Sequence, residues 1–135
     1  MTHPIAAELR QVPVFARLHR RELQRIDSLM TPLTFADGDV LLREDQIGRE
    51  AFVIVGGEVA VSRGDDYVTT LGPGDIVGET ALLTGRRRSA TVTATAPVTA
   101  YVMDVREFAS VLAIGGVGDA VRRVAERRER QLAAA

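Results

Sequence analysis

Hydrophobic and polar positions change their spacing twice along the chain, and the two changes divide it into three parts. In the first part, apolar side chains recur every three or four positions with arginines and glutamates between them, which predicts an amphipathic helix. These apolar positions are Phe15, Leu18, Leu23, Ile26, Leu29 and Met30. Because a proline disfavours helical geometry in the residue before it, Pro32 is expected to end this helical segment.

Short apolar or alternating runs separated by turn signals occupy residues 33–105, a pattern typical of antiparallel strands in a sandwich or barrel. Many of these runs are rich in Val and Thr, which suit a pleated and half-buried surface. Strands are expected at residues 33–36, 40–43, 51–55, 59–62, 67–71, 89–95 and 98–104. The strongest turn signal between them is the Gly-Pro-Gly-Asp sequence of residues 72–75.

The helical spacing returns after residue 105. Phe108, Val111 and Leu112 predict a short helix, and a last helix is expected from about Gly118 to the C-terminus. The length suits one domain with one hydrophobic core. We therefore expect a single α+β domain over residues 1–135. Its parts are a helical segment (1–31), an antiparallel, jelly-roll-like β-roll (33–105) and C-terminal lid or hinge helices (106–135).

Composition narrows the class of protein. Apolar residues make up 46% of the 135 residues and the net charge is −1, which indicates a soluble globular domain with no overall field that attracts nucleic acid or membrane. The chain has no cysteine, and His3 and His19 are its only histidines, so a thiolate or histidine metal site is not expected. No apolar run is long enough to span a membrane. A cytoplasmic protein without enzymatic activity is expected.

The segment of residues 72–92 carries the most informative chemistry. A single helical turn is expected at residues 79–83, and its unpaired N–H groups favour an anion such as phosphate. Gly78 permits a ligand to approach the backbone, Arg88 offers a fork of donors for phosphate oxygens, and Glu79 accepts from hydroxyl groups. Two other interpretations stay open at this point: Glu79 can serve only to cap its helix, and the Arg86–Arg88 triplet can be a solvated charge run.

Residues 78–83 (GETALL) followed by residues 88–92 (RSATV) resemble the phosphate-binding cassette of the cyclic nucleotide-binding domain family. That family includes regulatory domains of cAMP-dependent protein kinase, cyclic-nucleotide-gated channels and the bacterial catabolite activator protein. Turn glycines and strand residues also match, so the resemblance covers roughly residues 10–130. It implies a signal-transduction domain that binds a cyclic nucleotide, with cAMP favoured over cGMP, and that needs no prosthetic group.

The resemblance also implies roles for individual residues. Glu79 would accept a hydrogen bond from the ribose 2′-hydroxyl, and Arg88 would pair with an exocyclic phosphate oxygen. Neighbouring residues would cradle the sugar-phosphate, and the amides after Arg88 would complete the phosphate cage. The Ser89 hydroxyl would also reach the ligand; hydroxylated residues there often accompany cGMP, although bacterial cAMP-binding members use Ser too. The implied ligand-binding residues are Gly78, Glu79, Ala81, Arg88, Ser89 and Ala90.

Two residues depart from the family's pattern. Arg87 stands where the family usually has a proline, which frees the backbone and adds charge at the mouth of the pocket. Asp45 stands where many members have a turn glycine, and aspartate tolerates a left-handed conformation better than most residues. Neither departure removes a ligand-binding group.

In the family, the C-terminal helix closes over the bound base, and here the expected lid is residues 117–132. Gly115, Gly116 and Gly118 are the expected hinge. Arginines on this helix either contact the base or, as is more common, face solvent. The candidates are Arg122, Arg123, Arg127 and Arg128.

The predicted partners, besides the cyclic nucleotide, are a downstream effector protein or a fused effector domain, and a second copy bound through the C-terminal helix. We expect no direct nucleic-acid binding and no membrane insertion. Two alternatives keep the same fold: the sensor half of a transcription regulator whose DNA-binding domain lies outside this chain, and an interaction module that binds no nucleotide. An enzyme of the β-roll or cupin type is disfavoured because the histidines do not cluster.

Overall fold

Two four-stranded antiparallel sheets form the body of the computed structural model, which describes residues 8–134. His3 therefore lies outside the described residues. In spatial order, the first sheet consists of β1 (Thr31–Phe35), β8 (Val98–Asp104), β3 (Glu50–Gly56) and β6 (Ile76–Val77). The second consists of β2 (Val40–Leu42), β7 (Thr91–Ala94), β4 (Val59–Arg63) and β5 (Asp66–Leu71). The predicted α+β class with an antiparallel β-roll is confirmed.

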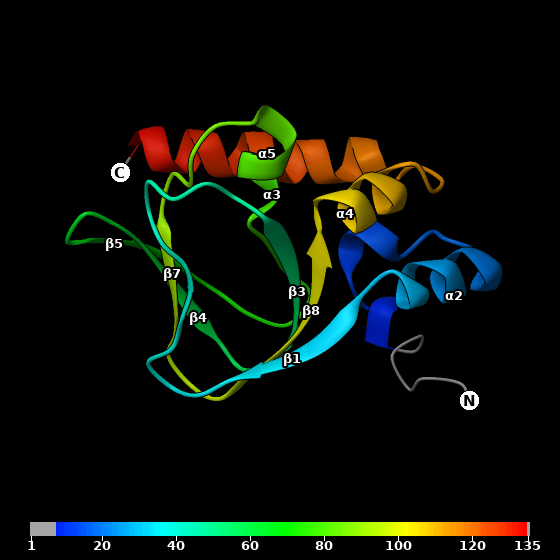
Figure 1. Cartoon of the computed structure of the whole chain (residues 1–135), viewed down its shortest axis with the longest axis horizontal. Helices are drawn as coiled ribbons and strands as arrows, with labels where there is room; N and C mark the ends of the chain where they lie inside the picture. Colours follow the sequence, from blue (N-terminus) through cyan, green and yellow to red (C-terminus); the bar gives the residue numbers. More distant parts are fainter. Residues whose placement is uncertain (1–7, 135) are drawn as a thin grey trace.

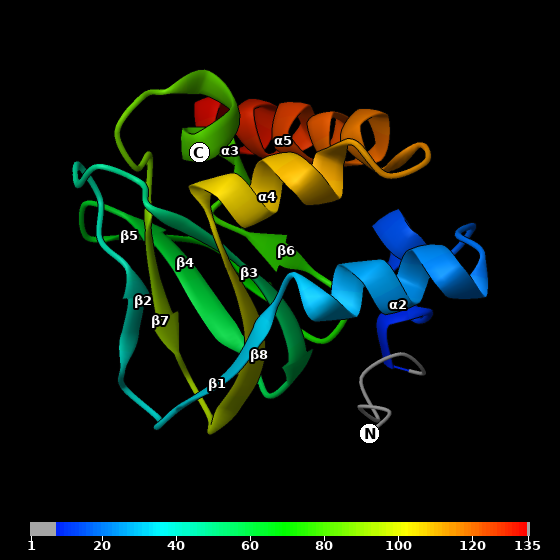
Figure 2. The same cartoon turned by 45° about the vertical axis from the view of Figure 1, so that its right-hand side comes forward.

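The helices pack around this roll, as Figures 1 and 2 show. They are the 3₁₀ turn η1 (Pro13–Phe15), α2 (Arg20–Ser28), α3 (Glu79–Thr84), α4 (Val105–Leu112) and α5 (Val117–Ala134). The long helix α5 runs along one side of the roll and contacts η1, α3 and α4. None of the described helices is both long enough and apolar enough to cross a bilayer.

The expectation of one helix that ends at Pro32 is wrong. The segment contains η1 and then α2, which begins after a capping box at His19 and ends at Ser28. Pro32 instead lies inside β1, where it pairs with Tyr101 of β8. Because β1 is an edge strand, the amide that proline lacks is not required by a second neighbouring strand.

Several strands differ from their predicted limits. β7 is shorter than the expected strand at 89–95 because residues 89 and 90 remain in the loop after α3. The two-residue strand β6 was not predicted; it pairs with Phe52 and Val53 of β3. The helix α3 runs one residue further than expected, to Thr84, and Gly85 ends it with a φ of 70°. β8 occupies the predicted residues 98–104.

The hydrophobic core has two parts, and β3 separates them. Successive side chains of a strand point to opposite faces, so Ala51 and Val53 pack with the helices while Phe52 and Ile54 face the interior of the roll. All four side chains are buried, which explains the continuous apolar run in this strand. The part inside the roll lies next to the segment with the candidate chemistry.

Candidate functional site

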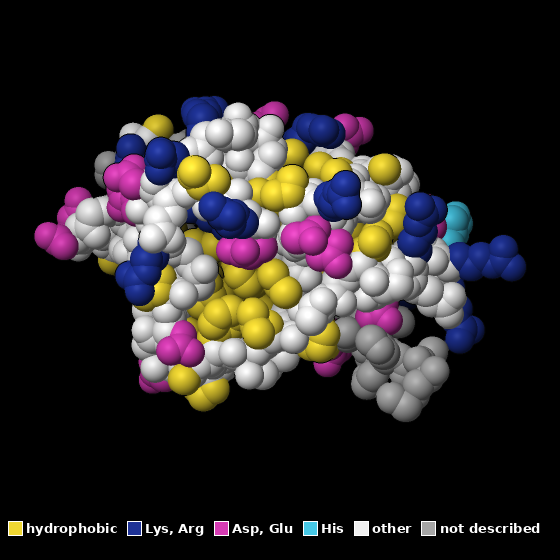
Figure 3. Space-filling model, viewed as in Figure 1, with side chains coloured by type: hydrophobic (Ala, Val, Ile, Leu, Met, Phe, Trp, Pro, Cys, Tyr) yellow, Lys and Arg dark blue, Asp and Glu magenta, His cyan; other side chains and the backbone are white. Residues whose placement is uncertain are grey.

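A cavity lies between the roll, α3 and the C-terminal part of α5. The space-filling view shows a hollow beneath α5 that is lined with hydrophobic side chains and edged by charged ones (Figure 3). All six residues predicted to bind a ligand line this cavity: Gly78, Glu79, Ala81, Arg88, Ser89 and Ala90. The cavity brings them together; their roles toward a ligand stay predictions.

Arg88 is held from behind by the backbone of the roll. Its side chain is 5% exposed, and its two terminal nitrogens donate to the carbonyl oxygens of Gly78 (2.8 Å) and Glu50 (2.7 Å). The Glu50 carboxylate lies 3.5 Å away. Burial lowers the pKa of Arg88, and the charges of Glu50 and Glu79 oppose this shift. Because a guanidinium has five N–H donors, it keeps donors for a further acceptor at the cavity.

Two glycines make room for this guanidinium. A Cβ on Gly78, whose φ is 85°, would lie 2.8 Å from Nη1 of Arg88 and 3.0 Å from the Glu50 carbonyl oxygen. A Cβ on Gly48 would lie 2.7 Å from the Cβ of Ala81 and 3.2 Å from both Cζ and Nη1 of Arg88. Gly78 was expected to admit a ligand, and in the structure it admits the Arg88 side chain. The part played by Gly48 was missed, since a glycine in an exposed loop carries no signal of what approaches it.

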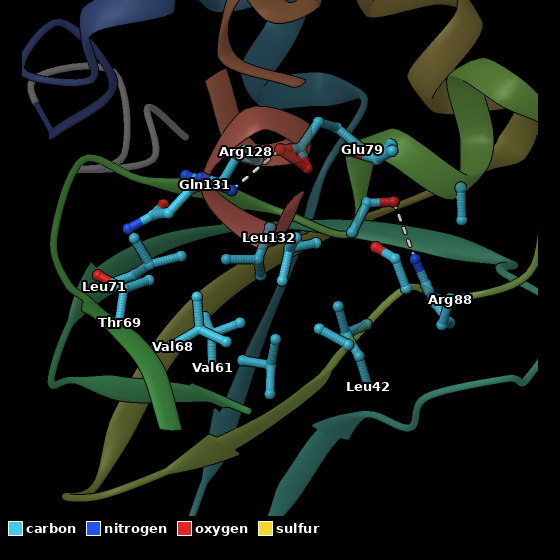
Figure 4. A pocket seen from close by; sticks show the side chains of 17 residues that line it. Leu42, Val61, Val68, Thr69, Leu71, Glu79, Arg88, Arg128, Gln131 and Leu132 are labelled. Atoms are coloured by element: carbon cyan, nitrogen blue, oxygen red, sulfur yellow. Dashed lines mark hydrogen bonds and ion pairs between the residues drawn. The ribbon is translucent and has the colours of Figure 1, made fainter. Parts of the chain in front are cut away.

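Glu79 lies on the other side of the cavity and is held by α5. Its side chain is 2% exposed, and its Oε1 accepts from Nη1 of Arg128 at 2.9 Å (Figure 4). Burial raises the pKa of Glu79; the charge of Arg128, the backbone amides of Glu79 and Thr80, and the charge of Arg88 oppose this shift. The two amides belong to the first turn of α3, so Glu79 lies at the N-terminus of this helix and lines the cavity as well.

Arg128 is the cavity residue whose position the sequence analysis did not single out. Its Nη1 also donates to the carbonyl oxygen of Ile76 at 2.6 Å, and its side chain is 19% exposed. A signal was present, because Val121 and Ala125 are buried on α5 and position 128 follows them at helical spacing. The other three candidate arginines of this helix are exposed, as solvated residues would be: Arg122, Arg123 and Arg127.

The two departures from the family's pattern contact each other. Asp45 has a φ of 69° and is the only non-glycine residue with a positive φ among those described, as its tolerance of the left-handed region allows. Nη1 of Arg87 donates to the Asp45 carbonyl oxygen at 2.9 Å. Next to this contact, the amides of Asp45 and Arg88 donate to the carbonyls of Arg88 and Gln46 at 2.9 and 2.8 Å. The loop before β3 is thereby joined to the segment that carries Arg88.

Glu79 and Arg88 are the only charged side chains buried among the described residues, and both line one cavity in a β-roll. The sequence profile of the cyclic nucleotide-binding domain matches residues 32–114, which include both. The chain belongs to the cyclic nucleotide-binding domain family. The resemblance seen in the sequence is confirmed.

Individual relatives agree with this assignment. The chain is 36% identical over 100 residues to a cGMP-dependent protein kinase of Eimeria tenella, covering 73% of this chain and 10% of the kinase. It is 33% identical over 132 residues to the acetyltransferase Pat of Mycolicibacterium smegmatis, covering 95% of this chain and 40% of Pat. The cAMP-bound structure of PfPKA-R superposes with a TM-score of 0.88 at 23% identity, covering 96% of this chain and 45% of that one. The chain thus spans less than half the length of these relatives.

Proposed function

We propose that the cavity binds a cyclic nucleotide, with cAMP preferred over cGMP, and that the chain is a cytoplasmic sensor without enzymatic activity of its own. The observation that carries this proposal is the pairing of one buried cation and one buried carboxylate across a single cavity in a member of this family. A sugar-phosphate needs both: its phosphate takes donors, and its hydroxyl needs an acceptor.

The phosphate would lie against Arg88. Two carbonyl oxygens already orient the guanidinium, so it loses little freedom when it pairs with a phosphate oxygen. The backbone amides of Ser89 and Ala90, which line the same part of the cavity, would complete the phosphate cage. Gly78 and Ala81 would lie against the sugar-phosphate on the other side.

The ribose and base would occupy the part of the cavity that α5 covers. An ionised carboxylate has about four lone-pair positions, so Glu79 can accept from the 2′-hydroxyl while it keeps Arg128. Leu132 extends from α5 toward the apolar wall of the cavity, which includes Val61 and Val68 (Figure 4). This wall suits the flat face of a purine.

Helix α5 would transmit ligand binding, since its Arg128 donates a hydrogen bond to Glu79, the proposed acceptor for the ribose hydroxyl. Gly115, with a φ of 50°, and Gly116 lie between α4 and α5 and are the proposed hinge. Gly118 was expected to share this role, but it lies in the first turn of α5, where a Cβ would be 2.9 Å from the Leu112 carbonyl oxygen. We therefore assign Gly118 to close helix packing. A nucleotide shifts α5 only as far as its affinity differs between the two positions.

The regulated output would lie in a fused effector domain or in a separate effector protein. The match of nearly the whole chain to 40% of an acetyltransferase supports a sensor that is one part of a larger protein. The alternatives to this function are the sensor half of a transcription regulator and an interaction module that binds no nucleotide. A second copy bound through α5 is a further proposed partner.

The first test measures cAMP and cGMP binding by titration calorimetry. Arg88→Ala is expected to weaken cAMP binding by on the order of 2–5 kcal/mol, because the phosphate charge would be left buried without a partner. Arg122→Ala, which removes the same charge from an exposed position on α5, should bind cAMP like the unmodified chain. Unchanged binding by Arg88→Ala would overturn the site, and tighter binding of cGMP would overturn the preference.

The second test combines a variant of Glu79 with a nucleotide that lacks the 2′-hydroxyl. The unmodified chain should bind 2′-deoxy-cAMP several-fold more weakly than cAMP, because the carboxylate loses its hydroxyl partner. Glu79→Gln should discriminate less between the two nucleotides. If both proteins show the same ratio of affinities, the ribose does not contact Glu79.

A further inference from the structure

A second hollow adjoins the cavity on the outer side of the loop after α3. The two share three lining residues, Thr80, Ser89 and Leu132, so they are neighbouring compartments. We call this second compartment the outer hollow.

The outer hollow is basic, although the chain as a whole has a net charge of −1. Arg63, Arg86 and Arg87 line it together with a single carboxylate, Glu129, which leaves an excess of two positive charges. They come from β4 and from the loop after α3, and their side chains are exposed. Three guanidinium groups around one hollow form a site for an anion with several oxygens, such as a phosphate group.

The contacts of these arginines leave most of their donors available. Arg63 donates to the Leu132 carbonyl oxygen at 3.4 Å, and Arg87 donates to Asp45 as described above. Arg86 lies 3.6 Å from the Glu129 carboxylate, and both partners are exposed, so this ion pair is weak. Because each guanidinium has five N–H donors, each of the three keeps donors for an incoming anion.

The order of residues in the loop places the two anion sites back to back. Arg88 is buried and faces the cavity, whereas Arg86 and Arg87 are exposed and line the outer hollow. The Ser89 side chain lies at the boundary and forms no hydrogen bond within the described chain. An extended ligand with one phosphate on Arg88 would therefore reach the outer hollow past Ser89.

We propose that the outer hollow is a second phosphate site, which takes either a further phosphate group of the nucleotide in the cavity or a free phosphate ion. The first form rests on the proposed function, since it needs a nucleotide on Arg88. The ligand class that it predicts is a nucleotide with two phosphates, and the free-ion form predicts that phosphate and cAMP bind together.

The test compares cAMP with a cyclic dinucleotide that carries two phosphodiester groups, by calorimetry at constant ionic strength. The double variant Arg63→Gln, Arg86→Gln should lose about tenfold in affinity for the dinucleotide and less than about twofold for cAMP, because only the dinucleotide reaches both sites. The double variant Arg123→Gln, Arg130→Gln removes equal charge from exposed positions elsewhere on α5. This control should change neither affinity by more than about twofold.

Glu129→Gln distinguishes a phosphate site from a clamp, by which we mean an Arg86–Glu129 ion pair that only fixes α5 to the loop after α3. At a phosphate site, loss of this carboxylate frees Arg86 and removes a repulsive charge, so the affinity for the dinucleotide should rise. A clamp between α5 and the loop would be broken equally by Glu129→Gln and by Arg86→Gln. Changes of the same sign in these two variants would therefore overturn the proposal.

Inorganic phosphate is the probe for the free-ion form. With or without cAMP, phosphate should shift the NMR signals of the Arg86 and Arg87 side chains in the unmodified chain but not those of Arg123 and Arg130. If phosphate leaves these NMR signals unchanged and the arginine variants bind the dinucleotide like the unmodified chain, the second phosphate site does not exist. If cAMP fails to bind while phosphate shifts these signals, the proposed function fails and the second phosphate site stands.

Discussion

The two buried charges of the cavity are held in different ways. Arg88 is fixed by carbonyl oxygens of Gly78 and Glu50, which belong to the backbone of the roll itself. Glu79 is paired with Arg128, a side chain on a helix that packs against the roll from outside. The Arg88 side of the cavity is therefore held by the backbone of the roll, whereas the Glu79 side depends on how α5 packs.

Under the proposed function, this difference assigns binding and signalling to different sides of the cavity. The two backbone acceptors of Arg88 lie beside the paired residues of β3 and β6, so under the proposed function the Arg88 side is suited to affinity. Arg128 reaches Glu79 and the Ile76 carbonyl oxygen from a separate helix, so under the proposed function the Glu79 side is suited to transmit a shift of α5. Substitutions on the two sides should therefore have different signatures.

The largest effect is expected on the Arg88 side, from Gly78→Ala. The new Cβ needs a left-handed backbone and would lie 2.8 Å from the guanidinium, so we expect a loss of about 2–4 kcal/mol in the free energy of unfolding. Binding of cAMP should fall as well, because the guanidinium must move. Denaturant titration and calorimetry measure the two losses.

Gly85→Ala is the matched control, because Gly85 also has a positive φ but nothing lies within 4 Å of its Cβ position. It should lose only the backbone cost of about 1 kcal/mol and keep its affinity for cAMP. If Gly78→Ala and Gly85→Ala lose equal stability and equal affinity for cAMP, the close contact of Gly78 with Arg88 contributes to neither.

The same contrast explains what the sequence could predict. Glu79 is the first residue of α3, and Arg88 follows nine positions later in the loop after that helix. Local turn and charge patterns suggested a sugar-phosphate site there but left other interpretations open, and the resemblance to the family made the shared site the prediction. Arg128 lies 49 positions from Glu79, and its partner depends on how α5 packs. The prediction that Pro32 ends a helix was wrong. An edge strand tolerates a proline, and the sequence alone does not show which strand lies at an edge.

A smaller effect is expected on the α5 side, from Arg128→Ala. Glu79 would remain buried without its cation, and we expect a loss of about 1–3 kcal/mol in the free energy of unfolding, less than for a fully buried pair. The affinity for cAMP should change less than in Gly78→Ala, while the response of α5 to cAMP should be lost. The NMR signals of α5 with and without cAMP report that response, and Arg127→Ala is the exposed control.

The pH dependence of stability sharpens this test. Burial raises the pKa of Glu79, so the folded state holds its proton more tightly than the unfolded chain. The tighter binding of this proton stabilises the folded state. The stabilisation is fully present below the ordinary pKa of glutamate and is lost as pH rises through the raised pKa of Glu79. Arg128→Ala removes the main opposing charge, so the pKa should rise further and this loss should extend to higher pH. Melting temperatures of both proteins across acidic pH would contradict the pairing if their profiles were parallel.

The smallest effect is expected from Asp45→Gly, which tests whether the loop before β3 helps to hold the Arg88 side of the cavity. Glycine adopts the left-handed backbone of this position without steric cost but is freer in the unfolded chain, so we expect a net gain of about 0.5 kcal/mol in the free energy of unfolding. Asp45→Ala should instead lose about 1 kcal/mol. The hydrogen bond from Arg87 uses the carbonyl of residue 45 and survives both changes. The affinity for cAMP should therefore stay within about twofold in both variants. A loss of stability in Asp45→Gly, seen by scanning calorimetry, would show that the aspartate side chain itself holds the loop against the Arg88 segment.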